Sequence, residues 1–190
     1  MFSRALQESL TTRRRGLDEV AAAHRAVGGS GPGRRRATEQ INHAYALLVS
    51  SQFQGFCRDL HTEVARSFAR QVPATVRDVF HVSLTKNRKL DRGNPNPGNL
   101  GSDFGRFGID LWAAMRARDR RNESRQAALR ELAVWRNAIA HQDFSSPDLG
   151  LRRVHLANVR RWRSACDALA RELDGMFSAY LTNLVGVPPW

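Results

Sequence analysis

One segment of the chain brings together four residues that could do chemistry: Arg136, Asn137, His141 and Asp143. Histidine titrates near neutrality, so His141 can accept or donate a proton. Arginine stays charged and donates paired hydrogen bonds to phosphoryl oxygens. We expect Asn137 to orient His141 or to hold a phosphate, and Asp143 either to restrain the imidazole or to cap a turn. The pattern suits proton transfer beside an anionic phosphorus centre.

The spacing of Arg136 and His141 sets a geometric condition on such a site. Five residues of α-helix turn through about 500° and rise about 7.5 Å, which leaves the two side chains about 140° apart. The pair can work together if the helix frays at His141, whose side chain leans back toward the N-terminus, or if a twofold mate completes each pair. Both arrangements favour a cleft at the seam of a homodimer.

The chain carries a formal charge of +12, and its 30 basic residues are all arginine except Lys86 and Lys89. This charge favours a nucleic-acid partner, although a coding composition rich in arginine gives the same count. Two basic clusters flank the candidate motif and are predicted to follow an RNA backbone, with a solvated face as the alternative. They comprise Arg116, Arg118, Arg120, Arg121 and Arg125 before the motif, and Arg152, Arg153, Arg160, Arg161 and Arg163 after it.

Two aromatic residues near these clusters offer stacking faces to an RNA base, Phe144 and Trp162. Trp162 falls in the apolar stripe of the last helix, so we expect it to be structural.

Several enzyme classes are excluded by missing signatures. The chain has no glycine-rich dinucleotide or Walker loop, no Cys-x-x-Cys, no His-Glu-x-x-His and no Gly-x-Ser-x-Gly. Its six histidines show no ligand-like pairing, so no metal centre and no cofactor are expected. Cys57 and Cys166 lie in apolar helical patterns, which predicts no disulfide framework. With no signal-like N-terminus and no long apolar run, we predict a cytoplasmic protein that does not enter a membrane.

The elements that must position the motif are helical throughout. Apolar residues recur at steps of three to five, which predicts an all-α fold, an antiparallel helical bundle forming a single domain over residues 1–190. Residues 1–33 are expected to form an N-terminal helix and a glycine-rich linker, and residues 34–185 the core bundle. Residues 86–105, rich in Gly, Pro and Asn, are expected to form a long loop between central helices. We expect Asn122 to cap the motif helix, which should end near residues 141–144.

The stretch Arg136-Asn137-Ala138-Ile139-Ala140-His141 resembles the HEPN superfamily, whose hallmark is an Arg, four to six residues, then a His, frequently with a polar residue directly after the Arg. Arg36 and His43 also fit the spacing, but they lack this context. Further stretches are similar to the RiboL-PSP type of HEPN protein, so that the resemblance spans residues 38 to 185. These stretches are Ala44-Tyr45-Ala46-Leu47-Leu48-Val49 through Phe56, Asn94-Pro95-Asn96-Pro97, and Asp103-Phe104.

The resemblance implies a metal-independent endoribonuclease built as a homodimer of all-helical protomers, with Arg136 and His141 as catalytic residues. RNA supplies its own nucleophile, the 2′-hydroxyl, and the products would be a 2′,3′-cyclic phosphate and a 5′-hydroxyl. Such a protein would be a toxin or an RNA-targeting defence effector, with an antitoxin or defence-system protein as a possible partner. Some relatives carry a modifiable Tyr two residues after the His; here that residue is Asp143, so that form of control has no target.

Two other functions fit the same sequence. A non-catalytic helical module that binds RNA or a protein would carry the same charge and the same apolar helix faces, but its binding would not depend on His141. A helical DNA-binding regulator would need a recognition helix, for which the sequence gives no convincing signature.

Overall fold

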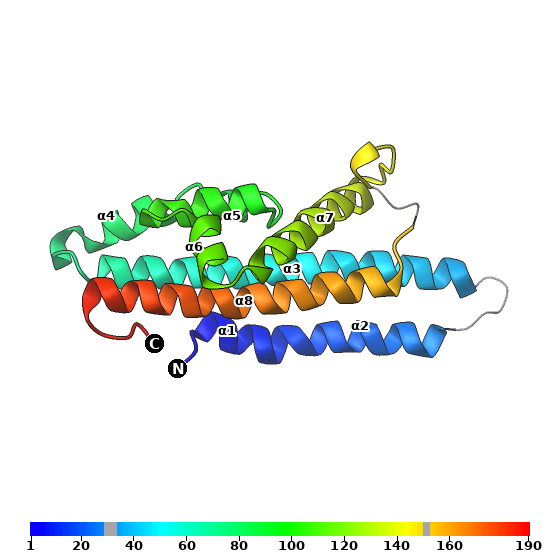
Figure 1. The fold of residues 1–190 in the computed structure, drawn as a ribbon, viewed down its shortest axis with the longest axis horizontal. Coiled ribbons are helices and arrows are strands. Elements are labelled where there is room, and N and C mark those ends of the chain that lie inside the picture. Colours follow the sequence, from blue (N-terminus) through cyan, green and yellow to red (C-terminus); the bar gives the residue numbers. More distant parts are fainter. Residues whose placement is uncertain (29–33, 150–152) are drawn as a thin grey trace.

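The computed structural model describes residues 1–28, 34–149 and 153–190, and every regular element in those ranges is a helix (Figure 1). The predicted all-α fold is confirmed. Of the predicted glycine-rich linker, residues 29–33 lie outside the described residues. The helices are α1 (Arg4–Glu8), α2 (Arg14–Val27), α3 (Arg34–Ala69), α4 (Ala74–Thr85), α5 (Pro97–Phe104), α6 (Leu111–Arg118), α7 (Arg121–His141) and α8 (Leu156–Val185), and one wider π-helical turn, Ser9–Arg13, joins α1 to α2.

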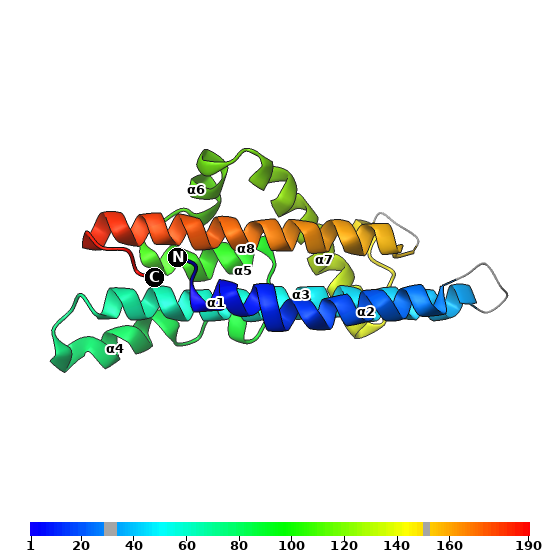
Figure 2. The ribbon, with the colours of Figure 1, turned by 90° about the horizontal axis from the view of Figure 1, so that it is seen from below.

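Three long helices, α2, α3 and α8, lie side by side, and α7 leaves them at an angle so that its C-terminal end projects from the bundle (Figures 1 and 2). Neighbours in sequence run antiparallel, as α2 with α3 and α7 with α8. The two longest helices, α3 and α8, instead run in the same direction, because the chain between them returns to the starting end of the bundle through α7.

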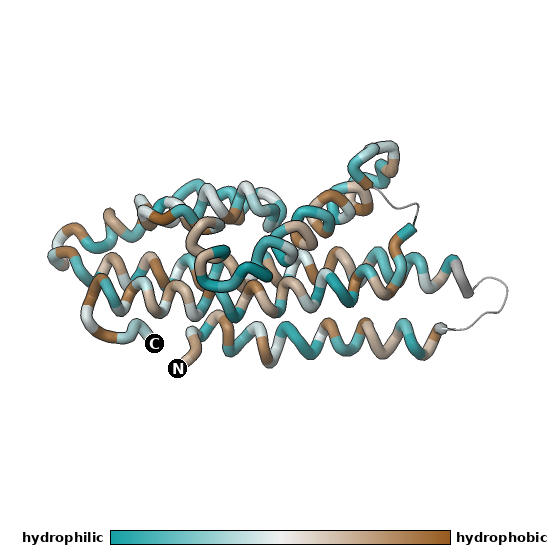
Figure 3. The backbone as a smooth tube through the Cα atoms, in the orientation of Figure 1, coloured by the Kyte–Doolittle hydropathy of each residue, from teal (hydrophilic) through white to brown (hydrophobic). Residues whose placement is uncertain are grey.

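The core forms where α3 packs against α8, and hydrophobic positions recur along both helices (Figure 3). Phe56 and Leu60 of α3 share one buried cluster with Trp162 and Leu169 of α8, and none of the four has exposed surface. Burying each such side chain contributes about 1.5–3 kcal/mol. The structural role predicted for Trp162 is confirmed.

The prediction of one long loop over residues 86–105 is wrong. Lys89–Asp91 form a 3₁₀ turn and α5 begins at Pro97. The Asn96 side chain accepts a hydrogen bond from the Asn99 backbone N–H at 2.8 Å, and the fixed φ of proline suits the first position of a helix. Asn96 and Pro97, residue types that favour loops, here begin a helix.

The prediction that Asn122 caps the motif helix is also wrong. Asn122 is fully buried inside α7, and its side chain donates a hydrogen bond to the Met115 carbonyl of α6 at 2.8 Å. A carboxylate oxygen of Asp119 accepts instead from the Arg121 backbone N–H at 2.9 Å. Asn122 therefore joins α6 to α7.

Among the described residues, no helix is long and apolar enough to cross a membrane.

His61 of α3 is buried and neutral beneath the segment that leads into α5. Its Nε2 lies 3.1 Å from the Asp103 carbonyl and donates to it, while its Nδ1 lies 3.3 Å from a guanidinium nitrogen of Arg88 and accepts. The imidazole also packs against the rings of Phe104 and Phe107, with centroids 5.3 and 4.6 Å away. Burial is the main cause that lowers the pKa of His61 from 6.5 to about 4.

We expect acid to destabilise the fold through His61. Between pH 6.5 and about 4 the unfolded chain binds a proton at this residue that the folded chain does not. The contribution of neutral His61 to the free energy of unfolding is therefore complete above this window. It is lost as the pH falls through the window, by about 3 kcal/mol in all. Urea unfolding at pH 7 and pH 4.5 measures the loss. The His61→Gln variant keeps a donor for Asp103 without titrating, so it should lose less stability; an equal loss in both proteins would contradict the assignment.

Candidate active site

The motif helix α7 stays regular through His141 and then ends within one residue. Gln142 adopts a left-handed conformation with φ of 54°, and the Asp143 backbone N–H donates to the Ala138 carbonyl at 3.0 Å. The Gln142 N–H donates to the Ile139 carbonyl at 3.3 Å, which completes a closed helix end. The helix ends where the sequence predicts, and it does not fray at His141.

His141 and Asn137 line one open depression of about 330 Å³ on the side and end of α7. The other lining residues are Val134, Ala138, Asp143, Ser146 and Asp148. Arg136 is not among them, as expected from the angle of about 140° between positions five apart on a regular helix. Within one chain the structure thus brings His141 to Asn137 and Asp143, but not to Arg136.

Asn137 connects Arg136 to this depression. A guanidinium nitrogen of Arg136 donates to the Asn137 Oδ1 at 3.2 Å. The same oxygen accepts a second hydrogen bond, at 3.0 Å, from the side chain of Asn94. The Asn137 oxygen is therefore occupied, and the Asn137 NH₂ is the end left for a ligand.

Asp143 serves as a turn residue. One carboxylate oxygen accepts hydrogen bonds from the Ser145 backbone N–H at 3.0 Å and from the Ser145 hydroxyl at 2.6 Å. These bonds, with a smaller effect of the nearby His141, lower the pKa of Asp143. Asp148 adds a second acidic side chain to the depression. A phosphate that approaches His141 therefore needs positive charge supplied from outside this depression.

The basic cluster before the motif is partly neutralised. Arg121 and Arg125 both pair with Asp119 at 3.0 Å, and Arg118 pairs with Glu172 of α8 at 3.0 Å. The Arg125 side chain is only 17% exposed. Arg125 therefore holds α7 to its neighbours.

Two other members of that cluster, Arg116 and Arg120, are exposed, and neither forms an ion pair with any residue that the structure describes. They keep their charge available to a ligand.

The basic cluster after the motif divides in the same way. Arg163 donates to the Tyr45 hydroxyl at 2.9 Å and to Asp18 at 2.7 Å, with its side chain 14% exposed, so it packs the bundle. Arg161 pairs with Glu131. Arg160 and Arg153 are exposed, and Arg152 lies outside the described residues.

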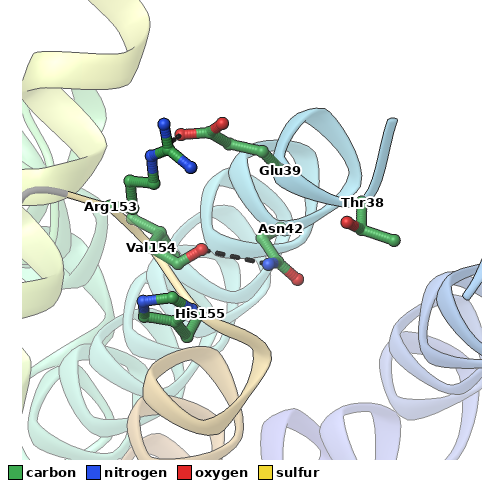
Figure 4. Close-up of a pocket in the computed structure, with 6 residues that line it drawn as sticks. All are labelled: Thr38, Glu39, Asn42, Arg153, Val154 and His155. Atoms are coloured by element: carbon green, nitrogen blue, oxygen red, sulfur yellow. Dashed lines mark hydrogen bonds and ion pairs between the residues drawn. The ribbon is translucent and has the colours of Figure 1, made fainter. Parts of the chain in front are cut away.

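Arg153 borders a second depression, of about 320 Å³, where α3 and α8 begin (Figure 4). Its guanidinium lies 4.0 Å from the Glu39 carboxylate. Asn42 of α3 is buried there and donates to the Val154 carbonyl at 3.0 Å, which anchors the start of α8. Arg153 thus faces a carboxylate, which reduces its value for phosphate.

Phe144, just beyond the motif, is 44% exposed and stacks on the His43 ring with centroids 5.7 Å apart. Burial lowers the pKa of His43. His43, which fits the spacing with Arg36, is therefore a packing partner of the motif end, while Phe144 keeps part of its ring free for stacking.

The residue that sequence reasoning missed as part of the site is Asn94. The motif Asn94-Pro95-Asn96-Pro97 contributes to the resemblance, but nothing in the spacing ties it to Asn137, which lies 43 positions away. The contact exists because α5 packs against α7.

Comparison with protein-family models, with curated proteins and with solved structures finds no match.

Among the described residues no group of three His, Cys, Asp or Glu side chains is placed to hold a metal ion. Cys57 and Cys166 are buried free thiols, and burial raises the pKa of both.

Proposed function

We propose that this protein is a metal-independent endoribonuclease of the HEPN type that acts as a homodimer. The observation that carries the proposal is the end of α7, which presents His141 and the Asn137 amide to one open depression, with the Arg136 guanidinium hydrogen-bonded to Asn137. These groups offer a proton carrier, a neutral donor and a fixed positive charge.

The reaction needs no group from outside the chain and the RNA. The 2′-oxygen bonds to phosphorus while the bond from phosphorus to the 5′-oxygen breaks. One proton leaves the 2′-hydroxyl and one reaches the departing 5′-oxygen, and an imidazole such as that of His141 can carry out either transfer. A guanidinium stabilises the negative charge that develops on the phosphoryl oxygens. A second chain would bring Arg136 to the acidic depression that holds His141.

The test is to incubate the purified protein with single-stranded RNA in excess chelator. We expect cleavage that leaves 2′,3′-cyclic phosphate and 5′-hydroxyl ends. A requirement for a divalent metal, or 5′-phosphate ends, would overturn the proposal.

A non-catalytic module that binds RNA or a protein is the second candidate. The observation that favours it is the regular helix between Arg136 and His141, which leaves the pair apart within one chain. In that case RNA would be retained without cleavage, and substitution of His141 would not change the affinity.

We also expect RNA binding to depend on the exposed arginines that lack ion pairs. Replacing Arg116 and Arg120 together by glutamine should weaken binding and reduce the slope of log K against log salt by about 0.7 for each phosphate that is no longer neutralised. Fluorescence anisotropy with labelled RNA across a salt series measures both quantities. Arg25→Gln on α2, also exposed, is the matched control and should leave the slope unchanged. An unchanged slope in the double variant would show that these arginines are only a solvated face.

A further inference from the structure

Asn94 is a buried asparagine whose amide orientation the structure fixes on every side. It is 6% exposed, and its Nδ2 donates to the Asn137 Oδ1 at 3.0 Å and toward the Ala133 carbonyl at 3.4 Å. Its own Oδ1 accepts from the Asn96 side chain at 2.7 Å. If the Asn94 amide were flipped, its oxygen would face the oxygens of Asn137 and Ala133, and its NH₂ would face the NH₂ of Asn96. Neither end could then form its hydrogen bonds.

The segment that carries Asn94 is also held in place. The Asn94 carbonyl accepts from the Asn99 side chain at 2.8 Å, and Gln54 of α3 donates to the carbonyls of Leu90 and Gly93 at 2.6 and 2.7 Å. A Cβ at Gly93 would lie 2.9 Å from Asn99 Nδ2, so only glycine fits there without a shift. Asn94 is thus presented to α7 from a rigid support.

The consequence appears at Asn137. Asn94 and Arg136 both donate to the Asn137 Oδ1, so this oxygen must face them and the Asn137 NH₂ must face the opposite way. No hydrogen bond from this NH₂ to any residue that the structure describes is formed. Asn137 also lines the depression that holds His141. The hydrogen bond from Asn94 therefore has two effects. It turns the Asn137 NH₂ away from Asn94, and it places the Asn137 Oδ1 where it accepts from Arg136.

We infer that Asn94 is a positioning residue of the active site, acting through Asn137 on the donor that meets the substrate phosphate and on Arg136. This inference rests on the proposed ribonuclease function. A pre-oriented donor needs no reorganisation when charge develops on the phosphoryl oxygens, so losing the orientation lowers the rate of the chemical step more than it lowers binding.

The test is Asn94→Asp, which keeps the shape and removes the donor. The new carboxylate would oppose the Asn137 oxygen, so the Asn137 amide should turn over and release Arg136. We expect kcat to fall about 10- to 100-fold, with KM within about threefold of the parent value. The resonances of the Asn137 side-chain NH₂ and the Arg136 guanidinium should shift in ¹⁵N spectra.

Asn42→Asp is the matched control, because it makes the same change at another buried asparagine, whose side chain donates to the Val154 carbonyl at 3.0 Å, and it leaves the contact from Asn94 to Asn137 in place. It should lower the melting temperature with kcat unchanged. If Asn94→Asp does not fold, Asn94→Ser is measured in its place, with the same expected direction. Asn94 is not a positioning residue if the folded variant cleaves like the parent, or if Asn42→Asp lowers kcat equally.

The two proposals fail in different ways. A parent protein that does not cleave RNA overturns the ribonuclease, and with it the catalytic part of this inference. The ¹⁵N spectra then decide whether Asn94 sets the Asn137 amide, since they need no activity: unchanged spectra in Asn94→Asp would overturn that too.

Discussion

Replacing His141 by alanine should lower the rate of RNA cleavage by about 10²- to 10⁴-fold, because the reaction loses its proton carrier. Replacing Arg136 by alanine should cost at least a comparable factor, because charge on the phosphoryl oxygens loses its guanidinium partner. His141 is exposed at the end of α7 and Arg136 is half-buried, and neither belongs to the core, so the fold and the melting temperature should change little. Single-turnover kinetics with a defined RNA in excess chelator measure the effect.

The control for this pair must lie away from the motif. His43→Ala changes the other histidine that follows an arginine within the four to six residues of the motif, and it is expected to retain activity if it folds. Its ring stacks on Phe144, however, so packing at the motif end changes with it. His24→Ala on α2 is the cleaner control, since α2 lies on the opposite side of the bundle from the end of α7 (Figure 1). If His141→Ala cleaves RNA like the parent, the catalytic assignment is wrong and a binding module takes its place.

Mixing two inactive variants should restore activity. Static light scattering should first show a homodimer at micromolar concentration. In a composite site, Arg136 of one chain acts with His141 of its partner, so a dimer of one Arg136→Ala chain and one His141→Ala chain keeps one intact site of two. Random pairing of equal amounts should then recover about one quarter of the parent activity.

The same experiment separates the two arrangements of the site. If each chain used its own Arg136 and His141, every site in the mixture would lack one residue and nothing would be recovered. Each variant refolded alone is the control and should stay inactive. A monodisperse monomer that cleaves RNA would contradict the composite site.

Much of this protein follows from its sequence alone. The helical spacing of apolar residues predicts the all-α bundle and the burial of Trp162, because a helix with one apolar face is stable when that face packs against its neighbours. The end of the motif helix near His141 was also predictable, although Gln142 takes the left-handed position that glycine usually fills. The divergence of Arg136 and His141 follows from helix geometry alone.

Other features were decided by contacts that no local pattern contains. Asn96 and Pro97 suggested a loop but start α5, because Asp103 and Gln54 hold the preceding segment in place. Asn122 looked like a cap, yet an available carbonyl of α6 draws it into the core. Which arginines keep their charge free depends on whether Asp119, Glu172 or Asp18 lies within reach. The contact of Asn94 with Asn137 joins residues far apart in the chain, and only the packing of α5 against α7 creates it.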